Sequence, residues 1–161
     1  MKKILITVLI IIIVAIVGIG GYFAYQKYFS TNAGWTEYTN DQLMAMVDEN
    51  WQNEAMFFKA RENNLLIVDQ GTAPPPRGLI IYDLNTKKKV FQDSYSTPLD
   101  ITNTTITYWN PTTQKVTVEN CSDYVKWTSQ GLGTEIESRV SLDLTTLTKK
   151  GLGQYRCQPT Q

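Results

Sequence analysis

Residues Glu135 to Leu144 read EIESRVSLDL, a stretch in which apolar and polar side chains alternate. Ile136, Val140 and Leu142 are an even number of residues apart, and charged residues stand between them. Successive side chains of a β-strand point to opposite faces, so the pattern predicts a strand with one buried face. Strands of this kind are typical of antiparallel sheets that are covered on one side only.

Short apolar and aromatic runs of the same kind fill the chain from Ala55 onward, and turn-forming residues separate them. They predict a mainly β fold, an antiparallel β-meander that forms a small barrel or sandwich. The expected strands are residues 56–61, 65–69, 79–83, 89–94, 104–109, 115–119, 124–129, 135–144 and 154–157. Asp83, Asn110 and Asp143 stand at or next to the ends of three of these runs. Each side chain is expected to begin a turn by accepting backbone hydrogen bonds.

One helix is expected between Thr36 and Trp51, before the first of these strands. Leu43, Val47 and Trp51 stand four residues apart and form one apolar stripe, which is typical of a helix that packs on a core. Thr39 opens a capping-box pattern at the start of this helix. We therefore expect the helix to cover an end or an edge of the sheet.

The run from Ile4 to Ala24 is apolar and contains no charged residue. At about 1.5 Å per residue, a helix of this length crosses a hydrocarbon core roughly 30 Å thick, so the lipid bilayer is an expected partner. Lys2 and Lys3 make the N-terminal flank the more basic one, which keeps it cytoplasmic and places the following domain outside the cell membrane. A cleaved signal peptide is the alternative, although its apolar core ordinarily has only about 7–15 residues.

The predicted organisation has three segments: an N-terminal transmembrane anchor (1–29), a juxtamembrane linker with the short helix (30–54), and an extracytoplasmic β-rich domain (55–161). After residue 29 the chain has 12 Lys and Arg against 15 Asp and Glu, a balance that argues against a nucleic-acid partner. The chain has no histidine, which excludes Ser-His-Asp and Cys-His catalysis and removes the commonest zinc ligand. No cofactor and no metal site are therefore expected.

Cys121 and Cys157 are the two cysteines of the chain, and both fall in the part predicted to be extracytoplasmic. Disulfides persist in oxidising compartments, so the two are expected to pair. In a cytosolic domain they would instead remain two free thiols. Closing a loop of this length stabilises a domain by roughly 3–4 kcal/mol on the chain-entropy model.

The stretch from Leu66 to Ala73, LIVDQGTA, resembles the aspartic-protease signature, in which an apolar strand ends in Asp-Thr/Ser-Gly-Thr/Ser. The resemblance implies a hydrolase in which Asp69 is a catalytic carboxylate that shares a proton with a twin and activates water. Gln70 stands where the family has a small hydroxyl residue, and the chain has no second copy of the motif. The twin would therefore come from a second chain. Ordinary turn chemistry at a strand end is the alternative interpretation.

Pro74, Pro75 and Pro76, followed by Arg77, form the most distinctive loop of the sequence. Three prolines favour a stiff, extended polyproline II segment whose missing N–H groups keep it out of a sheet. A stiff loop loses little entropy on docking, and the Arg77 guanidinium can hold a carboxylate or phosphate, so these residues are candidate binding residues. The alternative is a rigid crossover in which Arg77 pairs with Asp69.

Trp109 and Trp127 are the other candidate binding residues, because with Tyr108 and Tyr124 they can form an aromatic platform for a glycan or peptidoglycan. The alternative is that they belong to the core, where aromatic residues at alternating strand positions are more often found. The leading hypothesis is a non-catalytic binding or assembly module that contacts another cell-envelope protein, for which exposed strand edges offer β-augmentation. The hydrolase and the glycan-binding domain are the alternatives, and the sequence does not determine the ligand or the oligomeric state.

Overall fold

The computed structural model describes residues 35–160 and divides the chain into two units, Met1–Thr39 and Asn40–Gln161. In the first unit the described residues form a turn, in which the ring centroids of Trp35 and Tyr38 lie 5.8 Å apart. The expected membrane anchor from Ile4 to Ala24 lies outside the described residues. Among the helices of the described part, none combines the length and the apolar character needed to cross a bilayer.

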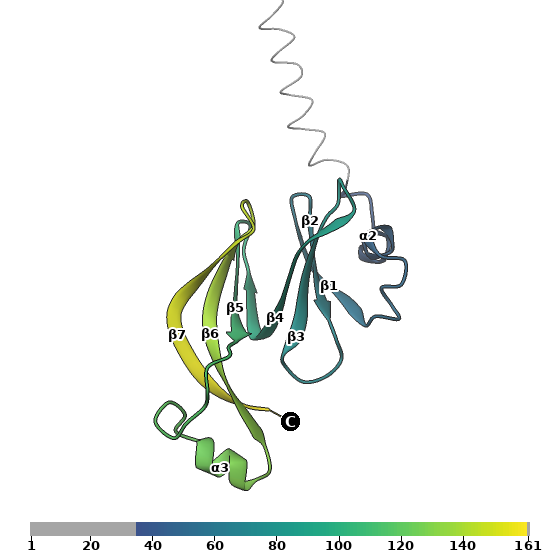
Figure 1. Cartoon of the computed structure of the whole chain (residues 1–161). Coiled ribbons are helices and arrows are strands. Elements are labelled where there is room, and N and C mark those ends of the chain that lie inside the picture. Colours follow the sequence, from purple (N-terminus) through teal and green to yellow (C-terminus); the bar gives the residue numbers. More distant parts are fainter. Residues whose placement is uncertain (1–34, 161) are drawn as a thin grey trace, which may run out of the picture. The chain divides into compact units, whose positions relative to one another are not determined.

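The second unit is a seven-stranded antiparallel sheet in which every strand pairs with the next one along the chain (Figure 1). This confirms the predicted mainly β fold. The first and last strands do not pair with each other, so the sheet is not closed and the barrel alternative is wrong. The strands are β1 (Met56–Glu62), β2 (Leu65–Gln70), β3 (Arg77–Asp83), β4 (Lys88–Ile101), β5 (Thr105–Pro111), β6 (Gly133–Asp143) and β7 (Thr148–Thr160).

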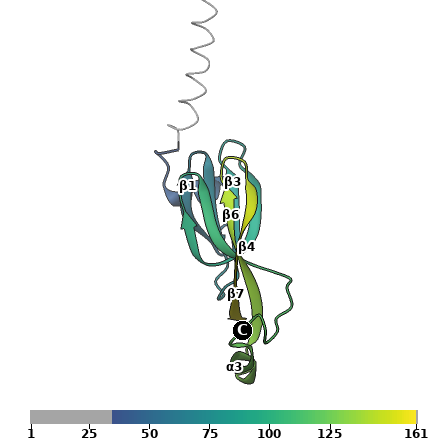
Figure 2. The same cartoon turned by 90° about the vertical axis from the view of Figure 1, so that its left-hand side faces the viewer.

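Strand β4 belongs to both halves of the sheet (Figure 2). Its first part, up to Tyr95, pairs with β3, and its second part, from Ser96, pairs with β5. The pairing with β5 shifts register between Ser96 and Asp100, an interruption that allows a strand to bend. The sequence predicted a shorter strand here, because Pro98 interrupts the apolar alternation.

The turns between strands confirm the predicted role of Asp83 and Asp143, whereas Asn110 lies within β5 and donates to Asp93 and Ser94 instead. The Asp83 carboxylate accepts a hydrogen bond from the backbone N–H of Thr86 at 2.9 Å between β3 and β4. Between β6 and β7, the Asp143 carboxylate accepts bonds from the N–H groups of Thr145 and Thr146, both at 2.8 Å. Each carboxylate satisfies backbone donors that have no partner in the sheet, and this favours a tight reversal of the chain.

The inner face of the sheet forms the main core, to which strands β2 to β6 all contribute. At its centre the rings of Tyr95 and Tyr108 meet edge to face, with their centroids 6.5 Å apart. The predicted buried face of β6 is confirmed at Val140 and Leu142, but the opposite face is not wholly exposed, because Glu137 on that face is also buried. The core residues are Leu65, Ile67, Leu79, Ile81, Tyr95, Ile106, Tyr108, Val140, Leu142 and Leu144.

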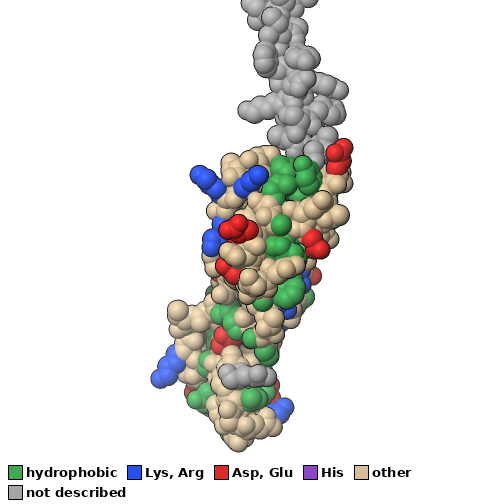
Figure 3. All heavy atoms as spheres, turned by 90° about the vertical axis from the view of Figure 1, so that its right-hand side faces the viewer, with side chains coloured by type: hydrophobic (Ala, Val, Ile, Leu, Met, Phe, Trp, Pro, Cys, Tyr) green, Lys and Arg blue, Asp and Glu red, His purple; other side chains and the backbone are tan. Residues whose placement is uncertain are grey.

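Helix α2 (Asn40–Val47) contacts β1 and lies beside the other face of the first strands (Figure 1). Its Leu43 and Met44 are buried, as are the outer-face residues Leu66 and Ile80 of β2 and β3. Figure 3 shows the side that carries α2, on which hydrophobic side chains emerge among polar ones. The helix is shorter than predicted, because Asp48 starts a turn by accepting a hydrogen bond from the Asn50 N–H at 2.9 Å.

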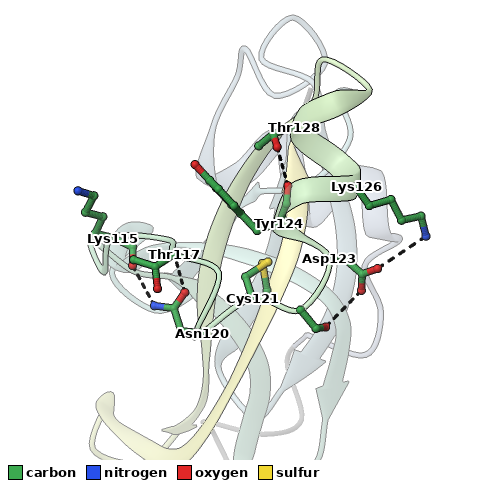
Figure 4. The surroundings of a disulfide bond; sticks show 10 residues. Lys115, Thr117, Asn120, Cys121, Asp123, Tyr124, Lys126 and Thr128 are labelled. Carbon is green, nitrogen blue, oxygen red and sulfur yellow. Dashed lines mark hydrogen bonds and ion pairs between the residues drawn. A yellow bond between two sulfur atoms is a disulfide. The ribbon is translucent and has the colours of Figure 1, made fainter.

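The segment between β5 and β6 corrects two predictions, since residues 115–119 and 124–129 form no strands. Strand β5 pairs directly with β6, which leaves this segment no place in the ladder. Asn120 holds a loop instead, with its side chain bonded to the Lys115 carbonyl (3.0 Å) and the Thr117 N–H (2.8 Å), as Figure 4 shows. The next residues form helix α3 (Tyr124–Ser129).

The predicted disulfide between Cys121 and Cys157 is confirmed (Figure 4). The two Cα atoms lie 5.4 Å apart, and the Cys121 side chain is buried. The bond ties the segment that carries α3 to strand β7. It therefore holds a long connection against the sheet in a region with few apolar contacts of its own.

Candidate binding pocket

A pocket of about 480 Å³ lies on the outer face of the second half of the sheet. Four parts of the chain form it: the β2–β3 loop, the bend of β4, the start of β6 and the end of β7. A volume of this size is within the range typical of ligand sites. The lining residues are Pro74, Pro75, Ser96, Thr97, Leu132, Glu135, Glu137, Arg156, Gln158, Pro159 and Thr160.

Glu137 and Arg156 form the charged centre of the pocket. They are direct cross-strand partners on β6 and β7, and the Arg156 Nε donates to Glu137 Oε2 at 2.5 Å. A second guanidinium nitrogen donates to the Thr97 carbonyl at 2.9 Å. The guanidinium also lies over the ring of Trp109, 4.4 Å from its centroid. Three contacts thus fix the orientation of Arg156.

Two polar atoms of the pocket residues have no hydrogen-bond partner within the described structure. They are Glu137 Oε1 and Ser96 Oγ, and both residues are almost fully buried, with exposed fractions of 0% and 3%. A buried polar group without a partner destabilises a fold by about 1–3 kcal/mol, and more if it is charged. Such groups therefore require an explanation, and a ligand that supplies donors is one.

Glu135 adds a second carboxylate to the same face of β6, two residues before Glu137. Partial burial, and then the charge of Glu137, raise the pKa of Glu135, while the charge of Arg156 acts in the opposite direction. The charged residues of the pocket lining are these two glutamates and Arg156. With all three ionised, the pocket carries one net negative charge.

The structure brings some of the predicted binding residues to this pocket and leaves others elsewhere. Pro74 and Pro75 form part of its wall, and Trp109 supports Arg156 from behind. Pro76 and Arg77 do not line it, and Trp127 lies on α3, partly buried and outside the lining. The candidate residues therefore do not converge on one surface.

The proline loop also corrects a conformational prediction. Thr72 to Pro76 form a series of bends rather than an extended polyproline II segment. The reason is topological: Gln70 and Gly78 are partners in adjacent antiparallel strands, so the chain must reverse its direction between them. An extended segment does not permit this reversal.

Asp69 lies away from the pocket, at the end of the inner face of β2, and only 1% of its side chain is exposed. Its Oδ2 forms ion pairs with Arg77 at 2.8 Å and with Lys59 at 3.2 Å. Arg77 also donates to the Gly71 carbonyl at 2.6 Å and lies over the Phe57 ring. The interpretation in which Arg77 pairs with Asp69 is thus confirmed.

This environment suits a structural carboxylate. A shallow depression of about 440 Å³ borders Asp69, and its lining includes both cations, Lys59 and Arg77. Burial, and then the neighbouring Asp69, raise the pKa of the Tyr95 hydroxyl. Both cations that pair with Asp69 come from its own domain, and they occupy the position where a catalytic twin would have to approach, so the hydrolase hypothesis gains no support from this geometry.

The aromatic residues predicted as a glycan platform are separated. Tyr108 is fully buried in the main core, where its hydroxyl donates to Asp93 at 2.7 Å. Trp109 is the next residue on β5 and points to the other face, where Arg139 and Arg156 lie over its ring. No platform is formed by these two side chains.

Glu135, Glu137, Ser96 and Arg156 are site residues that the sequence did not indicate. In the sequence, the two glutamates look like the solvated face of a half-buried strand. They are covered because the β2–β3 loop and the bend of β4 come to lie beside them, which is a long-range effect. Among residues 35–160, no cluster of three or more Cys, Asp or Glu side chains is placed to hold a metal ion.

Comparison with protein-family models, curated proteins and solved structures gives no match for this chain.

Proposed function

We propose that this chain is a membrane-anchored, extracytoplasmic binding module, and that the pocket of Glu137 and Arg156 is where it holds a partner in the cell envelope. The observation that carries the proposal is the Glu137 carboxylate. It is fully buried, it lines the pocket of about 480 Å³, and one of its oxygens has no hydrogen-bond partner among the described residues. A bound group that donates hydrogen bonds would satisfy this oxygen and offset the cost of burying it.

Two features of the chain support the extracytoplasmic, membrane-anchored location. The apolar run from Ile4 to Ala24, with Lys2 and Lys3 before it, has the length and flanking charge of an anchor whose N-terminus is cytoplasmic. The disulfide between Cys121 and Cys157 suits a domain in an oxidising compartment. An anchor of this kind would hold the domain close to other envelope proteins and raise their effective concentration.

The location is tested with a cysteine introduced at the exposed Lys115, in a variant whose native cysteines remain paired. A maleimide that does not cross membranes should label this cysteine in intact cells as fully as in permeabilised cells. Labelling only after permeabilisation would overturn the extracytoplasmic location.

Binding is tested by photo-crosslinking in intact cells. A photoreactive residue at Ala73, beside the pocket wall, should capture a partner protein, whereas the same residue at Lys87, on the exposed β3–β4 turn, should not. Glu137→Gln should abolish capture from position 73. Equal capture from both positions, or capture unaffected by Glu137→Gln, would contradict a role for the pocket.

A further inference from the structure

We propose that the ligand group of this pocket is the basic side chain, lysine or arginine, of a segment of the partner protein. The inference rests on the proposed function and adds the chemistry of what is recognised. It follows from the charge, the hydrogen-bonding groups and the walls of the pocket.

The pocket offers an excess of hydrogen-bond acceptors. The unsatisfied Glu137 Oε1 and the Glu135 carboxylate both accept hydrogen bonds. A cationic ammonium or guanidinium group carries several N–H donors and a charge opposite to the net charge of the lining. A neutral amide would supply donors but would leave that charge uncompensated.

Arg156, the one cation of the lining, is already engaged within the protein. Its Nε is bonded to Glu137, another nitrogen to the Thr97 carbonyl, and one face of its guanidinium lies against Trp109. A carboxylate or phosphate in the pocket would lie beside the buried Glu137 carboxylate and near Glu135, and both would repel it. The pocket therefore discriminates against acidic ligands.

The walls of the pocket also suit a basic side chain. Pro74, Pro75, Pro159 and Leu132 provide apolar surface around the charged centre. Lysine and arginine carry an apolar stem below the charged head, so one side chain matches both the walls and the centre. The two prolines have no N–H donors, and they lie in a loop whose backbone is already restricted.

The test uses the full chain in nanodiscs of phosphatidylcholine, a zwitterionic lipid that does not attract basic peptides by itself. Fluorotryptophan incorporated at the four tryptophans gives fluorine NMR signals, and Trp109→Phe assigns the one beneath Arg156. The probes are short acetylated, amidated glycine peptides with a central lysine, arginine, norleucine or glutamate. The lysine and arginine peptides should shift the Trp109 signal saturably, with affinity of roughly millimolar order, and leave the Trp51 signal unchanged.

Glu137→Gln should weaken binding of the lysine peptide by about tenfold or more, because it removes the charge that faces the ammonium group. Glu135 is less buried than Glu137, and Glu135→Gln should also weaken binding of the lysine peptide. The test therefore holds even if Glu137→Gln does not fold. Glu49→Gln, an exposed carboxylate after α2, is the matched control and should bind normally.

Equal binding of the norleucine peptide, binding of the glutamate peptide, or no shift with either basic peptide would overturn the inference. If crosslinking from position 73 depends on Glu137 while no basic peptide binds, the proposed function stands and only the ligand chemistry is wrong. If basic peptides bind but nothing is captured in cells, the proposed function fails.

Discussion

The Lys149 Nζ donates to Asp93 Oδ2 at 2.6 Å and so joins β7 to β4, two strands that are not neighbours in the sheet. Lys149 is opposite the core residue Leu142, which places both on the inner face. Asp93 also accepts hydrogen bonds from the Tyr108 hydroxyl at 2.7 Å and the Asn110 side chain at 3.0 Å. This network connects the two halves of the sheet at the margin of the core.

Asp93→Asn should destabilise the domain by about 1–2 kcal/mol, because it weakens a partly buried, charge-assisted network. Burial alone would raise the pKa of Asp93, but hydrogen bonds from Lys149 and Tyr108 hold it below its ordinary value. A lowered pKa means that the stabilisation is complete above the unfolded-state pKa and is lost as the pH falls through the folded-state pKa.

Urea denaturation near neutral pH and again at about pH 3 measures how the contribution of Asp93 to the free energy of unfolding depends on pH. The difference between wild type and Asp93→Asn should be large at neutral pH and smaller in acid. Asp100→Asn is the control, because Asp100 pairs with Arg139 but is 58% exposed, and it should change stability little. A pH-independent difference would contradict the assignment.

Arg77→Met should destabilise the domain by about 2–3 kcal/mol, because it leaves the buried Asp69 carboxylate with Lys59 as its remaining cation. Asp69→Asn in the same chain should recover part of the loss, since the uncompensated charge is then gone. A double-mutant cycle from thermal unfolding gives the coupling. Additive effects of the two substitutions would show that the ion pair contributes nothing.

Glu135→Gln should stabilise the domain while weakening the binding of basic peptides. The pKa of Glu135 is raised, so its charge opposes folding at every pH above the folded-state pKa, and this penalty disappears as the pH falls through it. Because Glu135 is partly exposed, we expect a gain of only about 0.5 kcal/mol near neutral pH.

The gain from Glu135→Gln should vanish at about pH 3, below the ordinary pKa of glutamate, where the Glu135 carboxyl is protonated in both the folded and the unfolded chain. Thermal unfolding at the two pH values, with Glu49→Gln as the neutral control, measures it. Opposite effects on stability and binding are the signature of a residue retained for function. A loss of stability would indicate that Glu135 has a structural role instead.

Replacing Cys121 and Cys157 together by serine should lower the free energy of unfolding by roughly 3–4 kcal/mol, because the bond closes a long loop. The sheet should persist, since none of its ladders depends on the segment that carries α3. Far-ultraviolet circular dichroism and urea denaturation, with and without reductant, distinguish the two effects. An unchanged urea midpoint after reduction would contradict the expected contribution.

The sequence by itself determined the local features of this protein. Alternation in residues such as Val140 and Leu142 predicted the strands, Asp83 and Asp143 predicted the turns, and Cys121 with Cys157 predicted the disulfide. Each of these signals acts over a few residues or depends only on which groups are present. Residues 124–129 were predicted as a strand but form a helix. A stretch this short does not distinguish the period of a helix from the period of a strand.

Only the tertiary structure decided where the charged groups lie. Glu137 stands at a position that alternation assigns to the solvated face, and it is buried because the β2–β3 loop and the bend of β4 come to lie beside it. Asp69 became a structural carboxylate because β1 and β3 bring Lys59 and Arg77 to the same point. These outcomes depend on contacts between distant parts of the chain, and such contacts form only when the sheet folds over its core.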